Sequence, residues 1–287
     1  MPFHRKSIRV QITLGRGVFP GTQDNTYVVE GLGVNVEVEK NGLPDLNKAN
    51  ISIANMAYDK MEQLTMLAFR PLRRAKNVVA VFAGEEGQQL DRVFVGEVTS
   101  AFADYSEAPD IEFKIEAASG SHPLQIVAAP VSVNGQTSAS ELIGRFAKEM
   151  GYTFKNDGVT AQVRNSVFNG SPLEKAKAVA DQCGIDMLCD DGEIIIMPRR
   201  KERKANVVPL LTAESGLLGY PTFTNKGIAL NAFFNPDFKL KGLVRVESIV
   251  PRASGTWRIT KLFHSLSAYR TDSEDWYSSI EAQWVSE

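Results

Sequence analysis

The fold of this chain is decided by LTAESGLLGYPTFTNKGIALNAFFNPDFKLKGLVRV, residues 211–246. Glycine and proline interrupt this stretch every few residues, at Gly216, Gly219, Pro221, Gly227, Pro236 and Gly242. Short apolar runs lie between them at 228–230 and 243–246. Short apolar runs separated by turn residues are typical of β-strands, so we expect a β-rich structure here.

The sequence before residue 120 has the same β character. Residues 7–14 and 31–40 alternate apolar and polar side chains, which predicts strands with one buried face. We expect further strands at 49–56, 77–83, 92–105 and 110–117, a turn at 41–44, and a short helix at 59–69. Gly96 stands in mid-strand, where glycine usually marks a bulge or a close backbone approach.

Residues 121–205 change to an α+β pattern. Helical periodicity predicts helices at 138–150 and 171–183, the first capped by Ser138 or Ser140 and ended by Gly151. The second begins with Ser171, Pro172 and Glu174, a capping-box pattern. An Asp-Gly turn at 191–192 predicts a β-hairpin between 186–189 and 193–197. The run PRRKERK, 198–204, is expected to be a solvated linker.

The last part of the chain, 206–287, returns to strands, expected at 244–250, 256–267 and 276–285. It resembles the first part: residues 94–105 align without gaps on 258–269, and after one inserted residue 115–117 meets 280–282, both Ile-Glu-Ala. An internal repeat explains this match. Two unrelated amphipathic hairpins would also overlay in this way, because β patterns specify sequence loosely.

The spacing S-G-L-L-G-x-P, then G-I-x-L-x-x-x-x-N-P, then K-G-L-V-x-V resembles the tail-hub proteins of contractile-tailed bacteriophages, which are related to the hub part of type VI secretion spike proteins. The order of elements over 49–117, with V-F-V-G-E-V at 93–98, resembles the first barrel of that family. The resemblance implies a mainly β fold with an α+β insert. Two tube-type β-barrel domains, 1–120 and 206–287, would flank a helix-helix-hairpin module, 121–205.

The resemblance also implies a function. Family members are structural baseplate subunits, and we expect a homotrimeric ring of pseudo-six-fold symmetry in the virion tail, assembled in the host cytoplasm. It would join the hexameric tail tube, or a tube-initiator protein, to the trimeric central spike and contact other baseplate proteins. DNA would pass through it during injection.

Composition is ordinary for a soluble globular protein. The chain has 287 residues, 43% of them hydrophobic, and a net charge of −2, so no anionic partner is indicated. We find neither a signal peptide nor an apolar run long enough to span a membrane. Cys183 and Cys189 are expected to be free thiols.

Catalytic patterns are scarce, so we predict no catalytic, cofactor-binding or metal-binding residues and no enzyme activity. His4, His122 and His264 are far apart in sequence, and His264 is expected at a surface or interface. The cysteine spacing does not match a zinc site. Asp190, Asp191 and Glu193 are interpreted as a hairpin turn, since the full calcium-binding loop pattern is absent.

An alternative is a hub whose 121–205 module binds or hydrolyses peptidoglycan. Hydrolysis requires a carboxylate acid/base in a cleft, for which the candidates are Glu141, Glu149, Glu174 and Asp191. Binding requires aromatic side chains that stack on sugars, and the available ones are Phe146, Tyr152, Phe154 and Phe168. Phe146 lies on the apolar helix stripe, which favours a core position instead.

The basic residues of the linker are Arg199, Arg200, Lys201, Arg203 and Lys204, interrupted by Glu202. They lack interleaved aromatics, so we expect no sequence-specific nucleic acid binding. A channel for DNA should avoid strong cationic contacts to phosphates. We therefore expect this run to face outward or into a protein interface, and the channel wall to be neutral to acidic.

Overall fold

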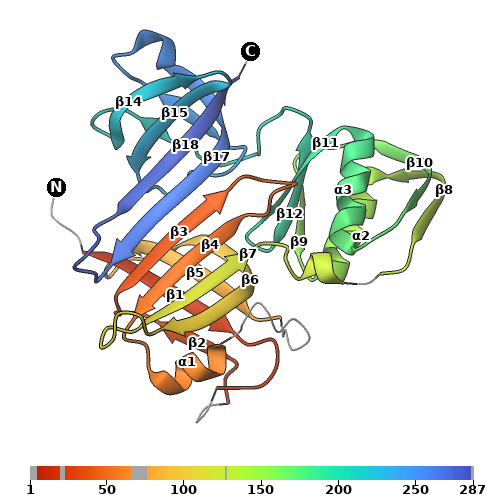
Figure 1. Cartoon of the computed structure of the whole chain (residues 1–287). Helices are drawn as coiled ribbons and strands as arrows, with labels where there is room; N and C mark the ends of the chain where they lie inside the picture. Colours follow the sequence, from red (N-terminus) through yellow and green to blue (C-terminus); the bar gives the residue numbers. More distant parts are fainter. Residues whose placement is uncertain (1–4, 20–22, 66–75, 127, 286–287) are drawn as a thin grey trace.

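The computed structural model describes residues 5–19, 23–65, 76–126 and 128–285. It is mainly β, with a small α+β module to one side, as predicted (Figure 1). Most strands belong to one mixed sheet with the order β14-β15-β18-β17-β3-β4-β7-β6-β5-β1-β2, and β16 pairs with both β13 and β17. Among the described residues, no helix is long and apolar enough to cross a membrane.

The first barrel region surrounds one hydrophobic cluster. Its elements are β1 (Lys6–Thr13), β2 (Thr26–Val29), β3 (Val34–Lys40), β4 (Lys48–Ala54), α1 (Tyr58–Leu64), β5 (Val78–Glu85), β6 (Asp91–Asp104) and β7 (Glu112–Ala118). The predicted alternation holds, since Ile8, Val10 and Ile12 are all buried. The predicted helix ends at Leu64, and residues 66–69 of that prediction lie outside the described part. At Gly96 a Cβ would lie 2.9 Å from the carbonyl carbon of Ala118, which is the expected close approach.

The module consists of η2 (Pro123–Gln125), β8 (Val131–Ser138), α2 (Ala139–Met150), β9 (Thr153–Asn156), β10 (Gln162–Phe168), α3 (Pro172–Cys183), β11 (Ile185–Asp190) and β12 (Glu193–Pro198). Both predicted helices and the hairpin are present, and Ser171 with Glu174 forms the capping box. The hairpin turn places Asp191 and Gly192 at positive φ, as a tight two-residue turn requires. Strands β8, β9 and β10 have no counterpart in the sequence-based prediction.

The second barrel region contains β13 (Leu210–Leu211), β14 (Leu217–Thr224), β15 (Gly227–Phe233), β16 (Leu243–Val246), η3 (Pro251–Ala253), β17 (Gly255–Ala268) and β18 (Trp276–Trp284). Two details differ from prediction. Gly219 and Pro221 lie within β14, at an irregularity in its pairing with β15, rather than in a turn. The strand expected at 244–250 ends at Val246, because Ser248 hydrogen-bonds to Ser254 and the chain turns into η3.

One ladder joins the two barrel regions. Strand β17 pairs antiparallel with β3 over Leu262–Ala268 and Val34–Lys40. The far end of β17 consequently crosses from one core to the other: Leu262 packs in the second hydrophobic cluster, while Leu266 and Ala268 pack in the first. The sheet is therefore continuous through both regions.

The internal repeat is present and extends over four ladders. Val98 opposite Ala117 corresponds to Ile259 opposite Ala282, and the bulge that follows falls at the same place in both hairpins. The pairs of β4 with β7 match those of β15 with β18, and the pairs of β5 with β6 match those of β16 with β17. The ladder of β3 with β4 matches that of β14 with β15, with two extra residues in β14.

The predicted alignment of the long strands was wrong by three residues. The sequence matched Val98 with Leu262, whereas the ladders match it with Ile259. The Ile-Glu-Ala match of the return strands is confirmed, since Ile115 faces Ala101 where Ile280 faces Leu262. A bulge shifts the alternation of buried and exposed side chains along a strand. Several offsets between the two long strands therefore align apolar residues with apolar residues, and the ungapped alignment selected an incorrect one.

Replacing Ser171 with alanine should loosen the start of α3. Ser171 Oγ accepts a hydrogen bond from the Glu174 amide, and losing an N-cap of this kind costs about 1 kcal/mol. Protection of the α3 amides against hydrogen exchange should fall roughly fivefold. Ser138→Ala is the matched control, because Ser138 precedes the equally long α2 without a side-chain cap bond. If Ser138→Ala lowered the protection of the α2 amides as much as Ser171→Ala lowers that of the α3 amides, this account would be contradicted.

Candidate assembly site

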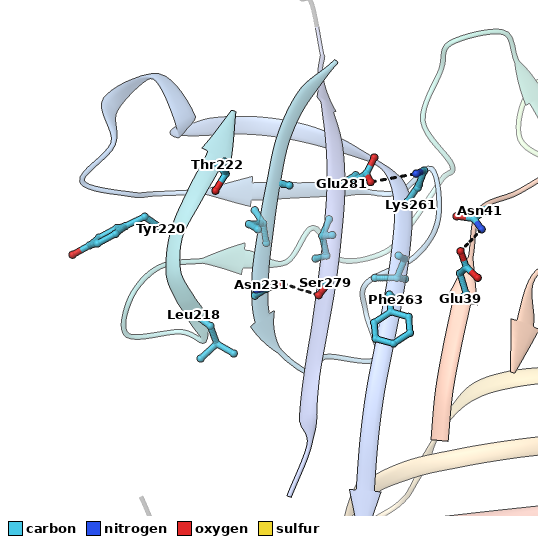
Figure 2. Close-up of a pocket in the computed structure, with 14 residues that line it drawn as sticks. Glu39, Asn41, Leu218, Tyr220, Thr222, Asn231, Lys261, Phe263, Ser279 and Glu281 are labelled. Carbon is cyan, nitrogen blue, oxygen red and sulfur yellow. Dashed lines mark hydrogen bonds and ion pairs between the residues drawn. The ribbon is translucent and has the colours of Figure 1, made fainter. Parts of the chain in front are cut away.

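The face of the main sheet that points away from the cores is polar, and it crosses from one barrel region to the other. Lys261 pairs with Glu281 at 3.3 Å, Ser279 Oγ donates to Asn231 Oδ1 at 2.7 Å, and Asn41 donates to Glu39 at 2.7 Å (Figure 2). The charged side chains that β3, β4, β7, β17 and β18 place on this face are Glu37, Glu39, Lys48, Glu112, Lys114, Glu116, Arg258, Lys261 and Glu281. Carboxylates slightly outnumber cations.

Two shallow pockets on this face occupy equivalent places in the repeat. One contains Phe263, Ile280 and Glu281, and the other contains their counterparts, Phe102, Ile115 and Glu116. Both linings mix apolar side chains, such as Phe263 and Phe102, with hydrogen-bonded and ion-paired polar ones. Such surfaces suit contact with a large partner or with solvent better than the enclosure of a small ligand.

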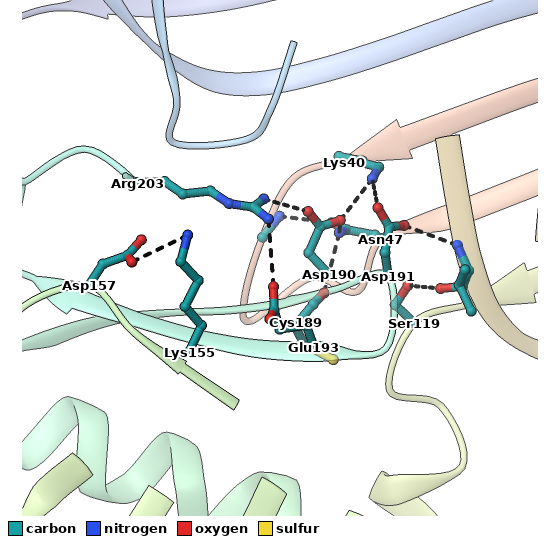
Figure 3. Close-up of polar contacts among 12 residues, drawn as sticks. Lys40, Asn47, Ser119, Lys155, Asp157, Cys189, Asp190, Asp191, Glu193 and Arg203 are labelled. Carbon is teal, nitrogen blue, oxygen red and sulfur yellow. Dashed lines mark hydrogen bonds and ion pairs between the residues drawn. The ribbon is translucent and has the colours of Figure 1, made fainter. Parts of the chain in front are cut away.

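A buried ion-pair network joins the module to the sheet (Figure 3). Lys40, at the end of β3, donates to Asp190 Oδ1 at 2.8 Å and to Asp191 Oδ2 at 2.9 Å. Arg203 Nη1 donates to Asp190 Oδ2 at 2.8 Å. Asn47 Nδ2 donates to Asp190 Oδ1 at 3.1 Å. The Val95 amide donates to Asp191 Oδ1 at 3.0 Å. The hairpin turn of the module is thereby tied to β3 and β6.

Burial and charge set the ionisation of this network. Burial alone would lower the pKa of Lys40, but the two aspartates raise it above its usual value. Burial opposes ionisation of Asp190, yet Lys40 and Arg203 hold its pKa well below the usual range. Burial and the negative charge of Asp190 raise the pKa of Asp191, which has Lys40 as its ion-pair partner. The network therefore contains an ammonium shared by two unequal carboxylates.

A second contact with the module centres on Glu97 of β6. Tyr152 Oη donates to Glu97 Oε1 at 2.5 Å, and the Gly120 amide donates to Glu97 Oε2 at 3.0 Å. Burial, together with the nearby Cys189 and Glu97, raises the pKa of Tyr152. Burial likewise raises the pKa of the Cys189 thiol, and both cysteines are free, as expected. Tyr152 therefore stays protonated and donates permanently.

His264 is buried within the chain, so the predicted surface or interface position is wrong. Its Nδ1 lies 2.8 Å from Ser278 Oγ, and the Phe234 ring packs edge-on against it. Burial and the positive charges of Lys40 and Lys239 lower its pKa to about 3, so the imidazole is neutral. His122 stands before η2, and His4 lies outside the described residues.

The carboxylates considered for hydrolysis have separate structural environments. Glu174 completes the capping box, Glu149 pairs with Arg145 along α2, and Asp191 belongs to the ion-pair network. Glu141 is exposed in the first turn of α2. Within the described ranges, no three His, Cys, Asp or Glu side chains are grouped as a metal site requires.

The aromatics considered for sugar stacking are mostly packed inside the module. Phe146 and Phe168 are buried in its core, and Phe154 packs against the same cluster. Tyr152 is directed at Glu97. These positions give the four rings a role in module packing and anchoring.

The prediction of a fully solvated linker was wrong for Arg203. Arg199, Arg200 and Lys201 are exposed, but the Arg203 side chain is only 14% exposed and pairs with Asp190. Arg203 also donates its amide to the Lys241 carbonyl, and the Lys204 amide donates to Asp157 Oδ2 at 2.9 Å. Sequence reasoning missed this because the partners of Arg203 come from distant segments, and a basic run carries no sign of which member is buried.

Comparison with known proteins identifies the family. The family model described as baseplate hub gp41 matches residues 7–277. The chain belongs to this baseplate hub family. It is therefore a structural tail protein of the phage-baseplate kind, and the predicted resemblance is confirmed.

Solved structures share the fold at low sequence identity. A 43 kDa tail protein of prophage MuSo2 from Shewanella oneidensis has a TM-score of 0.61 at 12% identity, covering 98% of both chains. A tail protein from Neisseria meningitidis MC58 has a TM-score of 0.60 at 8% identity, covering 96% of both. An E. coli component of the type VI secretion system has a TM-score of 0.59 at 11% identity, covering 96% of this chain and 77% of its own. A comparison with the curated proteins gives no match.

Replacing Lys40 with methionine should destabilise this hub protein by about 3–5 kcal/mol at pH 7, because it removes one partner of a buried ion pair. The wild-type contribution of Asp190 is present above the unfolded-state pKa and is lost as pH falls through its depressed folded-state pKa. In the variant this pKa should rise, so the deficit should shrink between pH 7 and pH 4. Urea denaturation of both proteins at several pH values measures this difference in the free energy of unfolding.

Lys261→Met is the matched control. Its pair with Glu281 is exposed on both sides, and such pairs contribute less than about 1 kcal/mol. If Lys40→Met were as mild as Lys261→Met at pH 7, the buried network would not be an important anchor.

Proposed function

We propose that the chain is the subunit of a homotrimeric hub ring of pseudo-six-fold symmetry, which joins the hexameric tail tube to the trimeric central spike. The observation that carries the proposal is the repeat of four ladders in register within one chain of the baseplate hub family. Three copies supply six similar sheet units, which is the number that a six-fold tube presents. The other side of the ring keeps the three-fold symmetry of a spike.

Two sheet edges that are unpaired among the described strands support assembly. The ordered path of strands ends at β14 on one side and at β2 on the other. Large apolar side chains are exposed on these end strands, among them Val28, Tyr220 and Phe223. An exposed apolar edge promotes aggregation in a monomer, and covering it with a neighbouring subunit removes the problem.

The polar face of the sheet is the proposed channel wall. It runs without a break across both barrel regions through the ladder of β17 with β3, and its charges are nearly balanced with a small acidic excess. A wall of this composition offers few cationic contacts to phosphates, so DNA can slide through it. The exposed Arg199 and Arg200 belong to the loop that follows β12, and the Arg200 carbonyl accepts a hydrogen bond from the Arg258 side chain of this face.

The remaining assignments follow from this role. We assign residues 1–120 and 206–287 to the two barrels and 121–205 to a structural module without enzymatic activity, since Glu174, Glu149 and the aromatics are engaged in capping, pairing and packing. The partners are the tube or its initiator protein, the spike, and other baseplate proteins. Assembly takes place in the host cytoplasm, and the assembled hub lets the genome pass at ejection.

Light scattering of the purified protein at several concentrations should give a mass near three times 31.6 kDa. Trimer formation should depend on concentration, because mass action governs association. A monomer at every concentration, unchanged when tube and spike proteins are added, would refute the ring.

Reversing charges on the proposed channel wall should create DNA retention. A Glu37→Lys, Glu39→Lys, Glu281→Lys variant should bind a short duplex in fluorescence anisotropy, with affinity that falls steeply with salt, while the wild-type ring does not. The control carries Glu86→Lys, Glu141→Lys and Glu274→Lys, which change the net charge equally at exposed sites elsewhere. Equal binding by both variants would show that the wall is not where DNA passes.

A further inference from the structure

Two segments from different barrel regions meet on one edge of β17, at a place that we call the junction. From the second region, the Lys241 amide donates to the Ile259 carbonyl, and the Ile259 amide donates to the Gly242 carbonyl, both at 2.9 Å. From the first region, β3 takes over the same edge, where its last residue, Lys40, pairs with Leu262. Strands β16 and β3 thus both pair with β17 but not with each other.

A single strand ladder does not set the angle between two parts of a sheet. Neighbouring strands twist relative to one another by about 10° to 35°, so one pair alone allows a range of about 25°. At the junction, β17 is the one strand that runs from one barrel region into the other. A fixed angle between the regions therefore requires a further contact that touches both of them.

The module hairpin, β11 with β12, covers the junction with apolar side chains. A buried cluster that is separate from the three larger cores contains Leu240 of the second region and three hairpin residues, Leu188, Ile195 and Met197. The first region enters the same contact at Gly42, just after β3. A Cβ there would lie 3.2 Å from Leu240 Cδ2 and 3.3 Å from Leu188 Cδ2. The module and both barrel regions therefore pack together at one point.

The hairpin is buried on both of its faces. Met187, Ile194 and Ile196 pack in the module core, whereas the residues that alternate with them, Leu188 and Ile195, pack at the junction. Strands that are covered on both faces are apolar at every position, and β12 contains such a run, Ile-Ile-Ile-Met. A module that was merely tethered to the barrels would carry polar side chains on its outer face.

Polar contacts tie the hairpin to each side of the junction. On the side of the first region, Lys40 donates to the two aspartates of the hairpin turn (Figure 3). On the side of the second region, Asp186 of β11 pairs with Lys241 at 3.8 Å. The Arg200 carbonyl, just after β12, accepts a hydrogen bond from the Arg258 side chain of β17. The apolar cluster is thus flanked by ionic and hydrogen-bonded contacts to both regions.

We propose that the module is an internal clamp, whose hairpin holds the end of β3 and the segment before β16 together on β17 and so fixes the angle between the two barrel regions. The chain enters the module from β7 of the first region and leaves it toward β13 of the second, and β11 and β12 lie beside the ends of β3 and β4 (Figure 1). The clamp acts within one chain, so it does not depend on the proposed ring.

Double electron–electron resonance between two spin labels tests the clamp, because the distance between labels on different regions reports the angle. Labels at Glu86→Cys and Lys226→Cys lie on exposed turns, one in each barrel region. Cys183→Ser removes the partly accessible native thiol. Labelled chains are diluted with unlabelled ones, so that only distances within one chain are measured. The intact clamp should give a narrow distance distribution.

Removing the contacts that the hairpin makes should broaden this distribution. Leu188→Ala with Asp191→Asn takes away packing against Leu240 and one carboxylate partner of Lys40. The distribution should become roughly twice as wide, because the twist of one ladder then limits the angle. Circular dichroism of each variant reports its folding.

The matched control makes the same kinds of change inside the module. Met187→Ala removes a side chain next to Leu188 that packs in the module core, and Asp181→Asn removes the partner of Lys177 on α3. This double variant should keep the wild-type width. Equal broadening in both double variants would trace the effect to general loosening of the module and would overturn the clamp.

A wild-type width in Leu188→Ala, Asp191→Asn also overturns the proposal. If that variant fails to fold, Leu240→Ala removes the same packing from the second region and leaves the module sequence intact. It should broaden the distribution as well, and a wild-type width there is equally decisive against the clamp. Light scattering separates this result from the proposed ring, since a monomer would refute the ring and leave the measured angle unaffected.

Discussion

The ladder between β17 and β3 is the constraint on which the rest of the structure depends. It joins two barrel regions through backbone hydrogen bonds over the whole of β3. These groups would otherwise be left unpaired next to two hydrophobic cores, at a cost for each unsatisfied group. The ladder also carries Leu266 and Ala268 into the first core, so that the first core is incomplete without the second half of the chain.

The same ladder positions the module. Lys40 is the last residue of β3 and lies opposite Leu262, from where its ammonium reaches Asp190 and Asp191 of the module hairpin. A buried ion pair is a modest source of net stability, because desolvation offsets much of the attraction. The ion pair nevertheless requires a specific geometry, and the hydrogen bond from the Val95 amide to Asp191 fixes the orientation of that carboxylate. The network therefore fixes where the module sits more than how stable it is.

Local patterns predicted local structure well. The apolar alternation of β1 and β3, the Ser171 capping box and the turn at Asp191 and Gly192 are short-range features, and the structure contains them all. Burial that depends on distant partners was not predictable. His264 is polar and lies in an amphipathic strand. It is nevertheless buried, because β3 pairs with the edge of β17 at this position and the Phe234 ring packs edge-on against the imidazole. Nothing in the sequence distinguishes Arg203 from the other members of its basic run, because its burial depends on the contact with Asp190.

The repeat was likewise predicted only in part, since its return strands were matched correctly and its long strands were not.

The continuity of the sheet within one chain also affects mechanical strength. In the proposed ring of six units from three chains, every second joint would be continuous within one polypeptide and stabilised by the first hydrophobic core. Such a ring has only three seams at which strands from different molecules can be pulled apart. Internal duplication would thus halve the number of intersubunit joints in the proposed ring and place them at regular thirds of its circumference.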